Sequence, residues 1–240
     1  MSCLQFPEIN LRYNPPRRYP TRRRKCSLNE SAFEAITEES AYWLGFLIAD
    51  GCITRDKRLP NSQPRLKINL AHIDLPQLHK LRNFLDFGGK ISICEKYCSM
   101  AVSSRRIVKT LETYGVVARK SQRTAAHSLL ECNRHFWRGV VDGDGGIYIK
   151  PGNYYPSVYL AGSGHLLRQF ASYVLSLGLT KQLPTVRSCR SITQLAVAGK
   201  QAVNIINHLY RDSNIALDRK RALAMTVIDL WRESIPTPGA

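Results

Sequence analysis

The chain has 240 residues and a formal net charge of +17, because 35 lysines and arginines outnumber 18 aspartates and glutamates. This excess favours a polyanionic partner, nucleic acid first and an anionic membrane surface second. No apolar run approaches the roughly 18 residues of a membrane-spanning helix, and the N-terminus lacks the apolar core of a signal peptide. Seven cysteines without paired CxxC spacing favour reduced thiols. We therefore expect an intracellular protein, in the cytoplasm, the nucleoid or an organelle matrix.

Residues 1–30 are predicted to form a basic arm. Arginines alternate there with tyrosines and prolines, and the prolines prevent a regular helix. Arg22, Arg23 and Arg24 are its most concentrated charges. The arm is interpreted as an extension that follows DNA phosphates; a solvated disordered tail is the alternative.

Two segments share one sequence pattern, which is the strongest signal in the chain. Residues 43–51 and 137–145 both contain a tryptophan, any residue, glycine, three mostly apolar residues, a small residue, aspartate and glycine. In each segment two small residues are four positions apart, which places them on one face of a helix. Small residues let two helix backbones approach closely. We expect two abutting helices that end in Asp50 and Asp144.

The first half is predicted to begin with a short helix over 31–39 that leads into a motif helix near 40–50. Strict alternation over 65–70 predicts a strand with one apolar face. The remaining predicted elements are an amphipathic helix over 74–87, a hairpin of 90–96 with 99–103, and a helix over 104–114.

The second half repeats this order. Its predicted elements are helix 134–144, strands 147–150 and 157–161, helix 163–177, a hairpin of 185–189 with 192–198, and helices 201–210 and 216–233. A lysine follows each motif aspartate at a similar distance, Lys120 after 70 residues and Lys220 after 76. A helix-hairpin-helix-hairpin-helix unit therefore occurs twice.

These paired motifs, with the element order and the basic charge, resemble the LAGLIDADG homing endonucleases over roughly residues 40–232. The resemblance implies an α+β fold of two pseudo-twofold-related αββαββα units, each with an antiparallel saddle-shaped sheet packed under helices. The expected domains are the arm, a first half over 31–133 and a second half over 134–235. The resemblance also implies a single-chain monomer that binds double-stranded DNA, with no membrane partner and no small-molecule cofactor.

The same resemblance assigns the catalytic centre. It implies that Asp50 and Asp144 bind the metal, with the backbone carbonyls of Ala49 and Gly143 as further ligands. Mg²⁺ is the expected ion because it prefers oxygen ligands and retains water. Lys120 and Lys220 match basic residues near the scissile phosphates, and the expected products are double-strand breaks with short 3′ overhangs. The alternatives are a helix-terminal turn acid for each aspartate and a surface lysine for each basic residue.

Some motif positions differ between the two copies. Asp142 has Ile48 as its counterpart, so this position is not expected to be a metal ligand. Arg138 replaces a small residue in the second motif, which is expected to affect packing more than the acids. His72 is expected either to line the first pocket or to have a structural role.

DNA recognition is expected from outward side chains of the strands, because a two-stranded ribbon fits the major groove. The candidates in the first half are Arg65, Lys67, Asn69, Lys90, Ser92 and Lys96. The candidates in the second half are Tyr148, Lys150, Tyr159, Arg187, Arg190 and Gln194. An ordinary solvated sheet face is the alternative.

The predicted activity is site-specific, metal-dependent cleavage of a long asymmetric DNA target. Two rivals use the same scaffold: an RNA-binding intron maturase and a DNA-binding protein that does not cut. Both would tolerate loss of the motif acids, whereas Asp50 and Asp144 are both present.

Overall fold

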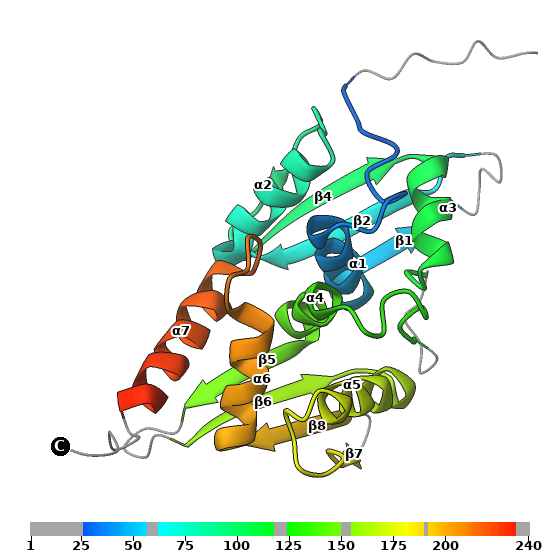
Figure 1. The fold of residues 1–240 in the computed structure, drawn as a ribbon. Helices are drawn as coiled ribbons and strands as arrows, with labels where there is room; N and C mark the ends of the chain where they lie inside the picture. Colours follow the sequence, from blue (N-terminus) through cyan, green and yellow to red (C-terminus); the bar gives the residue numbers. More distant parts are fainter. Residues whose placement is uncertain (1–25, 57–61, 118–123, 150–154, 190–191, 234–240) are drawn as a thin grey trace, which may run out of the picture.

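The structure is a computed structural model that describes residues 26–56, 62–117, 124–149, 155–189 and 192–233. Two successive αββαββα arrangements make up this part of the chain. Helices α1 and α4 lie side by side at the centre, with one four-stranded sheet on each side of the pair (Figure 1). The predicted α+β fold class is confirmed.

The first half follows the predicted order. Its elements are α1 (Glu38–Asp50), β1 (Gly51–Thr54), β2 (Arg65–Ala71), the 3-10 helix η1 (His72–Asp74), α2 (Leu75–Phe84), β3 (Ser92–Ile93), β4 (Tyr97–Ser103) and α3 (Arg105–Thr113). Helix α2 ends before the predicted Phe87, where Asp86 has a left-handed φ of 43° that a helix cannot continue through.

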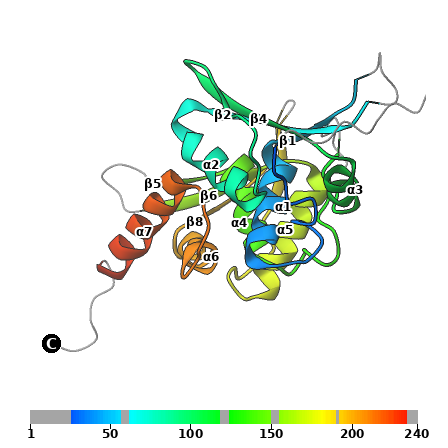
Figure 2. The same ribbon diagram turned by 90° about the horizontal axis from the view of Figure 1, so that it is seen from above.

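The second half repeats this order and adds a long final helix. Its elements are α4 (Arg134–Asp144), β5 (Gly145–Ile149), β6 (Pro156–Ala161), α5 (Gly164–Ser176), β7 (Val186–Cys189), β8 (Ile192–Ala198), α6 (Lys200–Tyr210) and α7 (Asp218–Glu233). Helix α7 extends away from the body at one side of the molecule (Figure 2).

Both sheets are antiparallel and have corresponding strand orders, β1-β2-β4-β3 and β5-β6-β8-β7. Side chains of β2 alternate between exposed and buried, as the period of a strand requires. Its buried residues Leu66, Ile68 and Leu70 belong to the core beneath the helices. Each sheet therefore keeps one face available to a partner.

The packing of α1 on α4 depends on glycine. A Cβ atom on Gly45 would lie 2.0 Å from the carbonyl oxygen of Phe136, and one on Gly139 would lie 2.0 Å from the carbonyl oxygen of Tyr42. No larger residue fits at either position without separating the backbones. The predicted contact between the two motif helices is thus confirmed, and it is the most extensive contact between any two described elements.

Both central helices have well-defined starts. The Thr37 side chain accepts a hydrogen bond from the Ser40 backbone, while Ser40 bonds back to the Thr37 backbone, which forms a capping box. Asn133 caps α4 by accepting from the backbone N–H groups of His135 and Phe136. Trp43 and Trp137, one turn further on, are fully buried.

The predicted short helix over 31–39 is wrong. Residues 30–34 form a turn, and α1 begins at Glu38, two residues before the expected start. The Asn29 side chain accepts hydrogen bonds from both the backbone and the hydroxyl of Ser31, which favours a turn over a helix. Burial of Phe33 then fixes this turn against the core.

Among the described residues, no helix combines the length and the apolar character that crossing a bilayer requires.

The substitution Gly139→Val should disrupt the pairing of α1 with α4, because its side chain would overlap the backbone of Tyr42. We expect the free energy of unfolding to fall by at least ~3 kcal/mol, measured by chemical denaturation. Gly164→Ala is the control, since the new Cβ would meet only the mobile end of Arg168 at 3.3 Å. An unchanged midpoint for Gly139→Val would contradict the close approach.

Candidate active site

Both motif aspartates lie at junctions between a helix and a strand. Asp50 is the last residue of α1 and Asp144 the last of α4, and β1 and β5 begin at the next residues. Both side chains belong to partly buried residues. Each acid is therefore placed where a central helix meets the first strand of its sheet.

The C-terminal ends of α1 and α4 are in direct contact. A Cβ atom on Gly143 would lie 2.2 Å from the Cβ of Ala49 and 3.3 Å from Oδ2 of Asp50. The Asp50 carboxylate therefore lies against the last turn of α4, the turn that carries Asp144. The carbonyls of Ala49 and Gly143 belong to the last turns of α1 and α4.

Lys220 reaches this region from α7 and is buried, with 6% of its surface exposed. Its Nζ donates to the carbonyl oxygens of Val141 at 2.8 Å, Asp142 at 2.6 Å and Gly145 at 2.6 Å. Burial lowers the pKa of the Lys220 ammonium to about 8, although the charges of Asp142 and Asp50 oppose the change. The surface-lysine alternative is therefore wrong for Lys220, while its part in the reaction stays a prediction.

Asp142, two residues before Asp144, is a buried structural acid. Its carboxylate accepts hydrogen bonds from the hydroxyls of Tyr42 at 2.9 Å and Tyr210 at 2.6 Å, and from the Leu217 backbone at 2.7 Å. Burial raises the pKa of Asp142, and these hydrogen bonds oppose the rise. Because it joins α4 to α1, α6 and the segment before α7, it fixes the helix that carries Asp144.

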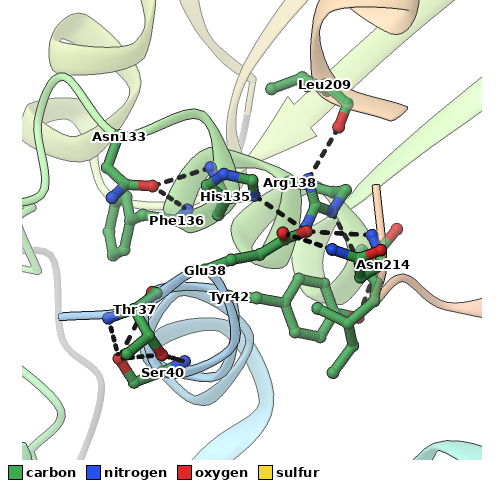
Figure 3. A network of polar contacts seen from close by, with 12 residues as sticks. Thr37, Glu38, Ser40, Tyr42, Asn133, His135, Phe136, Arg138, Leu209 and Asn214 are labelled. Atoms are coloured by element: carbon green, nitrogen blue, oxygen red, sulfur yellow. Dashed lines mark hydrogen bonds and ion pairs between the residues drawn. The ribbon is translucent and has the colours of Figure 1, made fainter. Parts of the chain in front are cut away.

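A second polar network joins the halves at the opposite end of the helix pair (Figure 3). The fully buried Arg138 donates to the carbonyl oxygens of Ile215 and Leu209 and to Glu38 at 3.1 Å. Glu38 also accepts from the backbone and side chain of Asn214. Partial burial raises the pKa of Glu38, but the Asn214 hydrogen bonds and the charges of His135 and Arg138 outweigh it and lower the pKa overall.

One functional candidate was missed by sequence reasoning. Arg219, next to Lys220, donates from Nε and Nη2 to the two carboxylate oxygens of Asp74 at 2.9 and 3.1 Å. Asp74 lies in the first half, as the last residue of η1 and directly before α2. The one available signal was the Arg-Lys pair, which occurs at 119–120 and again at 219–220.

The first sheet presents its predicted DNA-binding residues on one face. Arg65, Lys67 and Asn69 are exposed along β2, and in the register Asn69 lies opposite Ser99, which in turn lies opposite Ser92. Lys90 and Lys96 are exposed beside β3. These side chains therefore gather at one exposed face and its edge.

The second sheet has a different chemistry on the corresponding face. Tyr148 and Tyr159 are 52% and 46% exposed, and Arg187 pairs in register with Gln194. The ring of Tyr159 lies over Gly146, where a Cβ would come within 2.3 Å of the ring. The described part of this face is aromatic and polar more than cationic.

The remaining predicted positions fall outside the described residues. They are Arg22, Arg23, Arg24, Lys120, Lys150 and Arg190. His72 is exposed at the start of η1, and its backbone N–H donates to the carbonyl of Lys96.

The donor set at the helix ends fits a hard divalent cation. Two carboxylates and two terminal-turn carbonyls offer oxygen ligands alone, the kind that Mg²⁺ prefers. The described residues contain no group of three or more His, Cys, Asp or Glu side chains that could hold a metal.

No protein-family model and no curated protein sequence matches the chain. Solved structures match its fold. The LAGLIDADG meganuclease I-AabMI bound to uncleaved DNA has a TM-score of 0.60 at 15% identity, covering 82% of this chain and 92% of its own. I-GzeII in complex with its DNA target has a TM-score of 0.56 at 13% identity, covering 85% and 94%.

I-SmaMI, bound to an uncleaved DNA target in the presence of calcium ions, has a TM-score of 0.56 at 11% identity, covering 85% of this chain and 95% of its own. I-GzeII is described as a LAGLIDADG homing endonuclease, I-AabMI as a LAGLIDADG meganuclease and I-SmaMI as a meganuclease. The chain therefore has the two-unit fold of that class over most of its length. At these identities the likeness establishes the fold.

Glu38→Gln should destabilise the protein at pH 7, because the neutral amide loses the charge that pairs with Arg138. Since the pKa of Glu38 is lowered in the folded state, its contribution is fully present above the ordinary glutamate pKa of about 4.3 and is lost as the pH falls from there through the lowered pKa. Denaturation at a series of pH values should show the difference from wild type narrowing as the pH falls below about 4. A constant difference from pH 7 to pH 3 would contradict the ionic role.

Proposed function

We propose that this protein is a site-specific DNA endonuclease that makes metal-dependent double-strand breaks in a long asymmetric target. The observation that carries the proposal is the contact between the ends of α1 and α4, which brings the Asp50 carboxylate against the turn of Asp144. The two flanking sheets with exposed faces add a surface for duplex DNA on each side of these acids. Neighbours with the same fold are endonucleases in complex with DNA.

In this proposal Asp50 and Asp144, with the carbonyls of Ala49 and Gly143, hold Mg²⁺ ions at the centre. A divalent cation supplies positive charge to the scissile phosphate and acidifies water. The protein contributes orientation: the glycine contact fixes the distance between the helices, and Lys220 holds the turn before β5. By prediction, the positive charge of Lys120 also offsets charge that develops on the phosphate, and the charge of Lys220 would do so without direct contact.

The two halves, proposed as domains over 31–133 and 134–235, would each bind one half of the target. Two ribbons in line span about two turns of duplex, at about 10 bp per turn. The differing chemistry of the two exposed faces supports an asymmetric target. We further propose a monomer, cleavage with short 3′ overhangs, and phosphate contacts from the arm that includes Arg22, Arg23 and Arg24.

Target selection from a duplex library, followed by incubation with Mg²⁺, tests the activity. Asp50→Asn and Asp144→Asn should each abolish double-strand cleavage while keeping affinity for the selected target within about threefold, since a neutral amide is a poor ligand for a hard cation. The matched control is Asp229→Asn, an exposed aspartate of α7 that should cut normally. Gel analysis of both labelled strands separates nicking from double-strand cleavage.

Normal cutting of both strands by either mutant would refute the assignment of the acids. If the wild-type protein binds a selected duplex but cleaves none with any divalent cation, it is a DNA-binding protein that does not cut. Preferential binding to a structured intron RNA over duplex DNA would identify a maturase instead.

Lys67→Gln should weaken binding to the selected target and reduce the salt dependence of log K by about one unit of slope, if Lys67 neutralises one phosphate. The exposed Lys109 of α3 provides the control Lys109→Gln, which should leave the slope unchanged. Binding titrations at several salt concentrations measure both. Identical slopes for wild type and Lys67→Gln would remove this residue from the phosphate contacts.

A further inference from the structure

Lys220 has no donor to spare for DNA. A lysine ammonium has three N–H donors, and the three carbonyl oxygens of Val141, Asp142 and Gly145 lie within 2.8 Å of Nζ. Its side chain is also buried, so a phosphate could reach Nζ only after the end of α4 had rearranged. The contacts made by Lys220 instead satisfy carbonyls at a helix C-terminus, where a positive charge is favourable.

Arg219 differs from Lys220 in each of these respects. Its side chain is 51% exposed, and Asp74 engages two of its five N–H groups. The Asp74 side chain is only 9% exposed, so the pair fixes the guanidinium from its protein side. The remaining N–H groups are on a half-exposed cation that is already oriented, and a planar guanidinium suits phosphate recognition.

Arg219 also lies in the electrostatic field of the motif acids. Its own bond to Asp74 raises the pKa of Arg219 most, and the charges of Asp142 and Asp50 raise it further. The geometry agrees, because Lys220, the next residue in the chain, donates to the carbonyl of Gly145, which directly follows Asp144. The ion pair joins the two halves, because Arg219 is on α7 of the second half and Asp74 follows β2 in the first half.

Among the described residues, the position before α5 that corresponds to Asp74 has no acid. Asp74 directly precedes α2, whereas the corresponding helix α5 is capped by Ser163 and has no acid in its first turn. An arginine held by an aspartate in this way is therefore expected on one side of the pair of acids.

We propose that Arg219, oriented by Asp74, contacts a backbone phosphate at the cleavage centre on one DNA strand, while Lys220 is a positioning residue that holds the turn carrying Asp144. This inference rests on the proposed binding of duplex DNA and assigns the phosphate contact to the residue beside the predicted lysine.

The test is a double-mutant cycle between protein and DNA, read by equilibrium binding in Ca²⁺ without Mg²⁺. Each central phosphate of the selected target is replaced in turn by a neutral methylphosphonate. Arg219→Gln should weaken binding of the unmodified duplex about tenfold, because a hydrogen bond to a charged group is lost. It should weaken binding less than twofold when the contacted phosphate is already neutral, and this coupling should appear on one strand only.

Three further variants complete the design. Asp74→Asn keeps the arginine charge but removes the ionic pair, so the coupling should shrink without vanishing. Lys220→Met should change binding equally for all duplexes, since it contacts no phosphate. Arg221→Gln, the same substitution at an exposed arginine of the same helix, should show no coupling. Thermal denaturation of every variant confirms that it is folded.

Absence of coupling between Arg219 and every central phosphate, or coupling at Lys220 in its place, would overturn the inference. If the protein binds its selected duplex without cutting it, only the proposed catalytic function is refuted, because the binding measurement in Ca²⁺ needs no cleavage. A protein that selects no duplex fails both.

Discussion

The close approach of two helix backbones is the constraint on which the rest of this molecule depends. Gly45 and Gly139 each face a carbonyl oxygen of the opposite helix, so the helices touch through backbone atoms along one face. The contact leaves no freedom to slide, because a carbonyl fills the space that a side chain would need. Both sheets start directly from the ends of these helices, so their positions follow from the same contact.

Buried polar groups add a second level of order, and they make the halves unequal. Arg138 and Asp142 are both on α4 and both have hydrogen-bond partners. Arg138 donates to backbone carbonyls and Glu38, and Asp142 accepts from two tyrosines and a backbone N–H. The corresponding position to Asp142 in α1 is Ile48, which packs in the core. The two related central helices thus differ, since α1 is apolar at these positions and α4 is hydrogen-bonded. Loss of a single partner of a buried charge strongly lowers the stability of the fold.

Short-range sequence patterns predicted most of the helices and strands, because motif spacing, strand alternation and glycine breaks each depend on only a few neighbouring residues. The helix ends at Asp50 and Asp144 and the paired hairpins follow from such signals. The turn at residues 30–34 does not, because the hydrogen bonds of Asn29 and burial of Phe33 outweigh helix propensity. The polar networks were also beyond prediction: Glu38 and Asn214 are 176 residues apart in the chain, and the partners of Lys220 are backbone carbonyls that any sequence offers.

The location of Arg219 and Lys220 in α7 has a consequence for biosynthesis. The turn of Asp144 and the acid Asp74 are both synthesised long before the helix that contacts them. A nascent chain that still holds α7 inside the ribosome therefore lacks the two cations that contact Asp74 and the end of α4. Completion of the centre requires translation through α7.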